Sequence, residues 1–312
     1  MHRCLYCYKE IEEGIDFHKK CSVKFFGTKA PPVIEYTIDQ MAELAKHVVE
    51  RSVSLPGVQA KLSMTLVKET QAQSNPRLTI VGALGGGYIF KPPVELYPEM
   101  PQNEHLTMRM AEIFGIRTVP SSLIRLASGE LSYITKRVDR NPEGDKIHMM
   151  DMFQILEAFD KYLGSYEKIG KAIGEYSENP LLDKLFFFEM VLFSFLTGNN
   201  DMHLKNFSMI QSDSGWILSP AYDLLNVSIV LPEDEEDLAL TIAGKKKKLT
   251  LDYFQTFAEG MQLTKKQIDG VFTRFQNHKS QALDLISESF LSEGMKEQYF
   301  TCLEDRYTRI FL

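Results

Sequence analysis

The 312-residue sequence has no hydrophobic run long enough to cross a bilayer. Its longest apolar stretch, residues 185–196, contains Glu189 and is much shorter than the roughly 20 residues that a membrane helix needs. The first residues run straight into a cysteine pair and lack the apolar segment of a signal peptide. We therefore expect a cytoplasmic protein with no membrane partner.

Cysteine is also scarce, and basic residues are outnumbered by acidic ones. Four cysteines, three of them within the first 21 residues, are too few and too unevenly placed for a secreted disulfide scaffold. The formal net charge of -7 argues against a broad nucleic-acid-binding surface. A content of 44% hydrophobic and 25% charged residues is typical of an ordinary globular protein, and the length suits two packed lobes.

Hydrophobic periodicity changes along the chain. Up to about residue 140 the pattern favours short strands, and beyond residue 151 it favours helices, of which 181–196 is apolar on all sides and therefore buried. One hairpin signal, with arms at 207–210 and 216–218, interrupts the helical part. The sequence thus predicts an α+β fold with a small strand-rich N-lobe and a larger, mainly helical C-lobe. We expect strands at 61–67, 78–81, 88–91, 123–126 and 131–136, helices at 37–50 and 102–114, and domains at 1–30, 31–140 and 141–312.

A polar segment follows the buried helix and is the most informative part of the sequence. It contains Asp201 and Asn206, and the hairpin after it should return Asp223 to the same place. Two carboxylates and an amide oxygen form a hard-oxygen site that suits Mg²⁺. Asp-x-x-x-x-Asn followed by an Asp across a hairpin is the spacing of the base, the metal amide and the metal carboxylate in protein kinases. The alternative is a polar loop whose side chains cap a helix or a turn.

A kinase site also needs a phosphate cradle and a cation. Residues 54–59 contain Pro56-Gly57 before a strand, where backbone N–H groups can face phosphates, although such a dipeptide is also common in plain turns. Lys91 ends an apolar strand, and a buried ammonium needs an anionic partner. Phosphate oxygens and Glu104 are the two candidates. A lysine that extends from an edge strand into solvent is the alternative.

The N-terminal cysteines form a separate motif. Cys4-x-x-Cys7 and His18-x-x-Cys21 are two ligand pairs of the kind that hold tetrahedral Zn²⁺. Four protein ligands leave no open position, so the predicted role of a zinc ion is structural. The alternative is three reduced thiols and a surface histidine in a small helical cap.

Six motifs occur in order along the chain, at residues 52–62, 89–92, Asn103-Glu104, 136–140, 198–208 and 219–225. They resemble the motifs of the HipA-type serine/threonine kinases, which are the toxins of bacterial toxin–antitoxin modules. The resemblance covers residues 52–225 and implies a two-lobed protein-kinase-like fold. The chain is similar to the shorter HipT-type members, which lack the N-terminal subdomain of full-length HipA proteins.

The resemblance implies a role for each matching residue. Asp201 would be the catalytic base, Asn206 and Asp223 would hold Mg²⁺, and Ser52 and Ser54 would be autophosphorylated. The ATP-binding residues would be the phosphate loop Leu55, Pro56, Gly57, Val58, Gln59, Ala60 and Lys61, the phosphate-gripping Lys91, the hinge Lys136, Arg137 and Val138, and His203, Leu204, Lys205, Asn206, Tyr222 and Asp223.

These motifs predict an ATP-dependent serine/threonine-protein kinase that acts as a toxin. By resemblance its substrate is a protein such as an aminoacyl-tRNA synthetase, and its partner is an antitoxin with a helix-turn-helix domain, so that it meets DNA only indirectly. A small separate protein would supply the missing subdomain. A small-molecule or lipid kinase with the same ATP site is the alternative enzyme. A nucleotide-binding regulator without transfer activity is another class, against which the intact Asp201 argues.

Overall fold

The computed structural model describes residues 2–41, 43–44, 61–67, 76–81 and 85–312, which group into two compact units. Unit 1 comprises Met1–His105, Val119–Asp145 and Glu288–Phe290, and unit 2 comprises Leu106–Thr118, Lys146–Ser287 and Leu291–Leu312. Residues 1–30, expected as a module of their own, thus belong to the same unit as the N-terminal sheet. Residues 106–118 of the expected N-lobe belong to unit 2.

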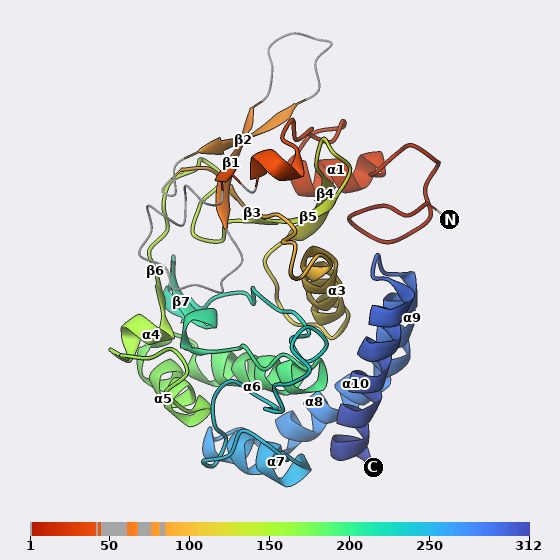
Figure 1. The fold of residues 1–312 in the computed structure, drawn as a ribbon. Coiled ribbons are helices and arrows are strands. Elements are labelled where there is room, and N and C mark those ends of the chain that lie inside the picture. The colour runs from red at the N-terminus through yellow and green to blue at the C-terminus, as the bar shows by residue number, and fades with distance from the viewer. Residues whose placement is uncertain (1, 42, 45–60, 68–75, 82–84) are drawn as a thin grey trace. The chain divides into compact units, whose positions relative to one another are not determined.

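Unit 1 is built on a five-stranded antiparallel sheet with the order β2-β1-β3-β5-β4 (Figure 1). Gly86, between β2 and β3, has a φ of 75°, and a Cβ there would lie 2.3 Å from the carbonyl oxygen of Met64, so only glycine fits. The strands begin and end within two residues of their predicted positions. They are β1 (Leu62–Val67), β2 (Arg77–Val81), β3 (Tyr88–Lys91), β4 (Ser121–Arg125) and β5 (Leu131–Lys136).

The N-terminal segment shares a hydrophobic core with this sheet. Helix α1 (Lys19–Phe26) ends at Gly27, which has a φ of 73°, and Phe25 packs against Tyr88 of β3 at a ring-centroid distance of 5.9 Å. Helix α3 (Met100–Ile113), which also begins in this unit, starts two residues before its predicted position. The core that joins the two parts includes Cys4, Leu5, Cys21, Phe25, Phe26, Leu62, Met64, Phe90, Leu123 and Ile134.

Unit 2 is organised around helix α6 (Pro180–Leu196), in which every residue from Phe186 to Leu196 is buried. Its two acidic side chains have partners, since Asp183 accepts a hydrogen bond from Leu218 N at 2.7 Å and Glu189 pairs with Arg274 at 2.5 Å. The predicted hairpin is present in a three-stranded sheet with the order β6-β7-β8. The strands are β6 (Met149–Asp151), β7 (Ser208–Ser212) and β8 (Gly215–Leu218).

The rest of unit 2 is mainly helical, as expected. Among the helices that the structure describes, none combines the length and the hydropathy needed to cross a bilayer. The remaining elements are α4 (Met152–Ile155), α5 (Tyr166–Tyr176), the 3-10 helix η1 (Leu204–Asn206), α7 (Leu251–Gly260), α8 (Lys265–Asn277), α9 (Lys279–Glu288) and α10 (Glu293–Phe311).

Candidate active site

The polar loop begins at Gly198, directly after the buried helix α6. Gly198 has a φ of 66°, and a Cβ there would lie 2.7 Å from Asn226 Oδ1 and 2.7 Å from Cys302 Sγ. Its carbonyl oxygen accepts hydrogen bonds from Val227 N and Ser228 N, both at 3.0 Å. The loop therefore leaves a rigid helix through a turn that only glycine can form.

Within the loop, Asp201, His203 and Asn206 are held close together by backbone bonds. His203 N donates to Asp201 O at 2.8 Å, and Asn206 N donates to His203 O at 2.9 Å. The Asn206 side chain is buried, and its Nδ2 donates to Asp201 O at 3.0 Å. Because the amide nitrogen is engaged in this way, Oδ1 is the atom of Asn206 that is suited to bind a cation.

His203 is buried between charged groups. Burial lowers its pKa, and this effect outweighs the opposing attraction of the Asp201 and Asp223 carboxylates, so the imidazole is neutral at pH 7. Lys205 N donates to His203 Nδ1 at 3.3 Å, which leaves the proton on Nε2. The histidine therefore caps the 3-10 helix η1 and adds no positive charge to the loop.

The hairpin β7–β8 returns the chain to this loop. Tyr222 lies beyond β8, and its hydroxyl donates to Lys205 O at 3.0 Å and lies 2.5 Å from Ser208 Oγ. The next residue, Asp223, has a φ of 61°, a left-handed conformation that aspartate adopts more readily than most residues. The predicted residues of unit 2 are thus brought together by the fold. Their roles in binding and catalysis stay predictions.

The donor set of this loop fits a hard divalent cation with a polyphosphate. Asn206 offers an amide oxygen, and Asp223 a carboxylate, which are the ligands that Mg²⁺ prefers. In addition, Asn199 Nδ2 and Asn200 Oδ1 are buried in the same loop and have no hydrogen-bond partner among the described residues. Buried polar atoms of this kind are uncommon unless they serve a bound group or an ordered water.

Tyr162 contacts the loop and was not predicted from the sequence. Its hydroxyl donates to Asp201 Oδ1 at 2.5 Å, and its ring meets that of His203 edge to face at a centroid distance of 5.1 Å. Lys161 O accepts a hydrogen bond from Leu204 N at 3.1 Å. Tyr162 lies 39 positions before Asp201, so no local motif in the sequence links the two.

In unit 1, Lys91 pairs with Glu104, one of the two anionic partners expected from the sequence. Its Nζ lies 2.6 Å from Glu104 Oε1, and both side chains are buried. The ring of Tyr133 also faces the ammonium at 5.3 Å. A lysine on the third strand that pairs with a glutamate on the following helix is an arrangement that active protein kinases require.

The predicted hinge, residues 136–138, begins at the last residue of β5. Arg137 N donates to Gly87 O at 2.9 Å, and its guanidinium makes two hydrogen bonds to Asp139, at 2.9 and 2.8 Å. Burial lowers the pKa of Lys136, whose Nζ lies over the ring of Phe25. Of the predicted phosphate loop, only Lys61 is described. Ser52, Ser54, Leu55, Pro56, Gly57, Val58, Gln59 and Ala60 lie outside the described residues, as do residues 42 and 45–50 of the helix expected at 37–50.

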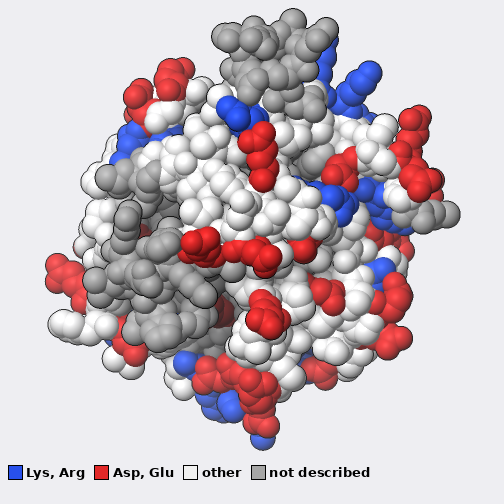
Figure 2. Space-filling model, turned by 45° about the horizontal axis from the view of Figure 1, so that its top comes forward, with Lys and Arg blue, Asp and Glu red and all other residues white. Residues whose placement is uncertain are grey.

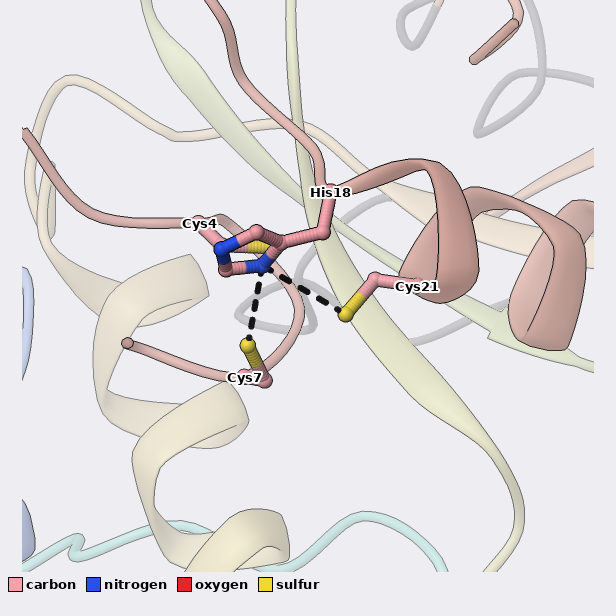
Figure 3. Close-up of side chains that lie close together, drawn as sticks. All are labelled: Cys4, Cys7, His18 and Cys21. Atoms are coloured by element: carbon pink, nitrogen blue, oxygen red, sulfur yellow. Dashed lines mark hydrogen bonds between the residues drawn. The ribbon is translucent and has the colours of Figure 1, made fainter. Parts of the chain in front are cut away.

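The four predicted zinc ligands form a cluster in unit 1 (Figure 3). The ligand atoms of Cys4, Cys7, His18 and Cys21 all lie within 4.8 Å of one another. The hydrogen bond with Cys7 lowers the pKa of Cys4 to about 4 and raises that of Cys7. The cluster is separate from the residues that the kinase motifs supply.

Acidic and basic residues occur together on the surface of the described part of the protein (Figure 2). On the face drawn in Figure 2, acidic and basic side chains are interspersed over the described part of the protein. In the basic run 245–248, Lys246 pairs with Glu236 at 3.2 Å and Lys247 with Glu235 at 3.4 Å. These pairs neutralise part of the run.

Sequence comparison relates the chain to bacterial kinases. A Haemophilus influenzae protein described as a putative kinase is 28% identical over 290 residues, which cover 83% of this chain and 81% of that protein. The serine/threonine-protein kinase toxin HipA of Shewanella oneidensis is 25% identical over 254 residues, or 74% of this chain and 56% of the toxin. The chain thus spans little more than half of the toxin's length.

Structural comparison shows a protein-kinase-like fold, as the sequence predicted. The structure of HipA of Shewanella oneidensis, solved with HipB and its operator DNA, matches this chain with a TM-score of 0.68 at 22% sequence identity. The match covers 86% of this chain and 70% of the HipA chain. The Helicobacter pylori proinflammatory kinase CtkA matches with a TM-score of 0.54 at 17% sequence identity, over 72% of this chain and 87% of the CtkA chain. The sequence profile of the HipA-like C-terminal domain matches residues 53–283, well over half of the chain. The chain therefore belongs to the HipA-like C-terminal domain family.

Proposed function

We propose that this chain is an ATP-dependent serine/threonine-protein kinase. The observation that carries the proposal is the arrangement of the loop after α6. There the Asn206 side chain donates a hydrogen bond to Asp201 O, and the carboxylates of Asp201 and Asp223 both act electrostatically on His203. A carboxylate, an amide oxygen and a second carboxylate at this spacing are what phosphoryl transfer requires of a protein. The kinase names of the relatives support the same reaction.

Each residue then has a chemical role. The Asp201 carboxylate would accept the proton of the substrate hydroxyl as that oxygen bonds to the γ-phosphorus of ATP and the bond to the β–γ bridging oxygen breaks, so that ADP leaves. The Tyr162 hydroxyl holds the carboxylate in place. ATP would supply the phosphoryl group and Mg²⁺ would offset its charge, with Asn206 and Asp223 as the metal ligands. Lys91, oriented by Glu104, is the proposed phosphate-binding cation, and residues 136–138 are the proposed adenine-binding hinge.

Exposed apolar side chains beside the loop favour a protein substrate over a small molecule. Phe159 and Leu163 flank the Tyr162 segment and are 102% and 76% exposed. Large exposed apolar side chains on the segment that contacts Asp201 through Tyr162 are suited to bind a peptide near its acceptor hydroxyl. A small-molecule or lipid kinase remains the alternative, because the metal and base residues define the donor and not the acceptor.

The biological setting belongs to the proposal as well. We infer that the kinase is a cytoplasmic toxin that phosphorylates a protein such as an aminoacyl-tRNA synthetase and is held by an antitoxin with a helix-turn-helix domain. The Shewanella relative, which was solved with HipB and operator DNA, supports an antitoxin partner. Autophosphorylation at Ser52 and Ser54, and a separate protein that supplies the N-terminal subdomain of full-length HipA proteins, are proposed from the sequence motifs alone.

Radiolabel transfer from [γ-³²P]ATP tests the reaction and the acceptor class together. The full chain with Mg²⁺ is incubated with a desalted bacterial lysate and, separately, with the small-molecule and lipid fractions of that lysate. Label in protein, on serine or threonine by mass spectrometry, is the expected result. Label confined to small molecules or lipid would establish the alternative kinase, and no label in any fraction would contradict the proposal.

A further inference from the structure

The cluster of Cys4, Cys7, His18 and Cys21 has the dimensions of a metal site. The distance from His18 Nδ1 is 3.5 Å to Cys7 Sγ and 3.8 Å to Cys21 Sγ. Zinc with bonds of about 2.3 Å to sulfur and 2.0–2.1 Å to nitrogen in a tetrahedron separates its ligand atoms by roughly 3.5–3.8 Å. The side chains in Figure 3 point toward one common centre. The two distances from His18 thus match a tetrahedral ion, and the four ligand atoms, all within 4.8 Å of one another, need only small shifts to surround it.

The orientation of His18 points to the same use. Its Nε2 lies 3.0 Å from Glu10 O, and a carbonyl oxygen can only accept a hydrogen bond. The proton of the neutral imidazole therefore sits on Nε2, and the lone pair of Nδ1 faces the thiols. A backbone carbonyl that fixes the second nitrogen in this way is the usual outer partner of a metal-bound histidine.

Backbone hydrogen bonds place both ligand pairs in advance. Tyr8 N donates to Cys4 O at 3.0 Å and Cys4 N to Lys9 O at 2.9 Å, which closes the first pair into a tight knuckle. Cys21 N donates to His18 O at 2.9 Å in the first turn of α1, which fixes the second pair. Cys4 and Cys21 are buried, so the site is closed on the side of the core.

The same segment completes the sheet of unit 1. Leu123 N of the edge strand β4 donates to Leu5 O at 3.2 Å, and Arg125 of β4 pairs with Asp16 at 3.0 Å. Leu5 N donates to Asp16 O at 2.9 Å, so both contacts of β4 depend on how this loop is folded. Cys4 and Cys21 both lie in the core of unit 1, so an ion bound to both would tie the segment to that core.

We propose that Cys4, Cys7, His18 and Cys21 bind one structural zinc ion that fastens the N-terminal segment to β4 and to the core of unit 1. All four positions are filled by protein atoms, so the ion takes no part in chemistry. Zinc binding of this kind contributes folding free energy directly, because the four ligands are held together only in the folded chain. The proposal is independent of the proposed kinase function.

Metal analysis of the full chain, expressed with added zinc, tests the site. We expect about one zinc per chain in the wild type and in the control Cys302→Ser, whose thiol lies in α10 outside the cluster. In His18→Ala the zinc content per chain should fall by about tenfold or more. His18→Cys restores a four-ligand set and should retain the ion. Wild-type protein that is folded and free of zinc, or equal zinc in the wild type and His18→Ala, would overturn the site.

Cobalt keeps the test decisive should His18→Ala fail to fold. Co²⁺ alone, added to chelator-treated wild type, should give the intense visible bands of a tetrahedral thiolate site, and weak octahedral bands would contradict the proposal. Hydrogen exchange tests the fastening role. Zinc removal should speed exchange of residues 2–26 and of the Leu123 amide, while α6 in unit 2 stays unchanged. Unchanged exchange in residues 2–26 would show that an ion, if bound, does not hold the segment.

Discussion

The hydroxyl of Tyr162 donates a hydrogen bond to the Oδ1 atom of Asp201 at 2.5 Å. Burial raises the pKa of this phenol, and the nearby Asp201 charge raises it further, so Tyr162 remains a donor throughout the neutral range. A short bond between a protonated phenol and a carboxylate fixes the direction of the carboxylate. Tyr162 is therefore a positioning residue for the proposed base.

Tyr162→Phe should lower kcat for phosphoryl transfer by about 10- to 100-fold, because a hydrogen bond to a charged group is worth roughly 1.5–3 kcal/mol. The KM for ATP should stay the same, since the ring and its contact with His203 are kept. Steady-state kinetics measure both values. Tyr176→Phe is the control, because Tyr176 is exposed on α5. An unchanged kcat in Tyr162→Phe would remove Tyr162 from this role.

Asp223→Asn should weaken the binding of Mg-ATP by about 10-fold, as the carboxylate charge on the metal is lost. Asparagine tolerates the left-handed φ of 61° at this position, so the backbone is kept, whereas alanine would add strain. Calorimetry with and without Mg²⁺ separates the metal from the nucleotide. Asp213→Asn, in the exposed turn between β7 and β8, is the matched control. Equal Mg-ATP affinity in Asp223→Asn and the wild type would rule out Asp223 as a metal ligand.

Lys91→Met should destabilise the protein by about 3–5 kcal/mol, because it removes the Lys91 ammonium from the buried Glu104 carboxylate. Lys91→Met/Glu104→Leu should recover much of that loss, since two apolar side chains then replace the pair. Urea unfolding measures the differences. Glu35→Gln breaks the exposed pair with Arg77 and should change stability by less than about 1 kcal/mol. A double variant that is less stable than Lys91→Met would contradict this account.

Asp237 should make unit 2 sensitive to acid. Burial raises its pKa, but the guanidinium groups of Arg309 and Arg306 outweigh burial and hold the pKa below its usual 3.8. A lowered pKa contributes stability that is present above pH 3.8 and is lost as the pH falls through the folded value.

The variant Asp237→Asn should therefore be less stable than the wild type at pH 7, by about 3–5 kcal/mol, because Arg306 stays buried without its carboxylate. The difference should shrink as the pH falls below 3.8. Urea unfolding at a series of pH values measures it. Glu235→Gln, at an exposed pair in the same segment, is the control. A gap between Asp237→Asn and the wild type that is independent of pH would show that Asp237 does not titrate in this way.

Local patterns explain why much of the fold could be predicted from the sequence. Alternation in β1 and the all-round apolar character of α6 are short-range signals, and they located both elements to within two residues. The Cys-x-x-Cys and His-x-x-Cys pairs indicated a cluster because each pair is local, although the approach of one pair to the other depends on the fold.

Contacts between distant residues could not be predicted in the same way. Nothing near Tyr162 indicates a contact with Asp201, because that contact depends on how the segment after α4 lies against the loop. The partner of Lys91 stayed open for a similar reason. Burial of the ammonium predicts an anion, and only the position of α3 selects Glu104.

Asp201 is the proposed base of a phosphoryl-transfer site. The most direct test measures the rate at which Asp201→Asn transfers ³²P from Mg-[γ-³²P]ATP to protein. The amide has the shape of the carboxylate but cannot take the proton, so transfer should fall by about 100-fold or more while calorimetry shows Mg-ATP still bound. Transfer by Asp201→Asn at the wild-type rate would contradict the account.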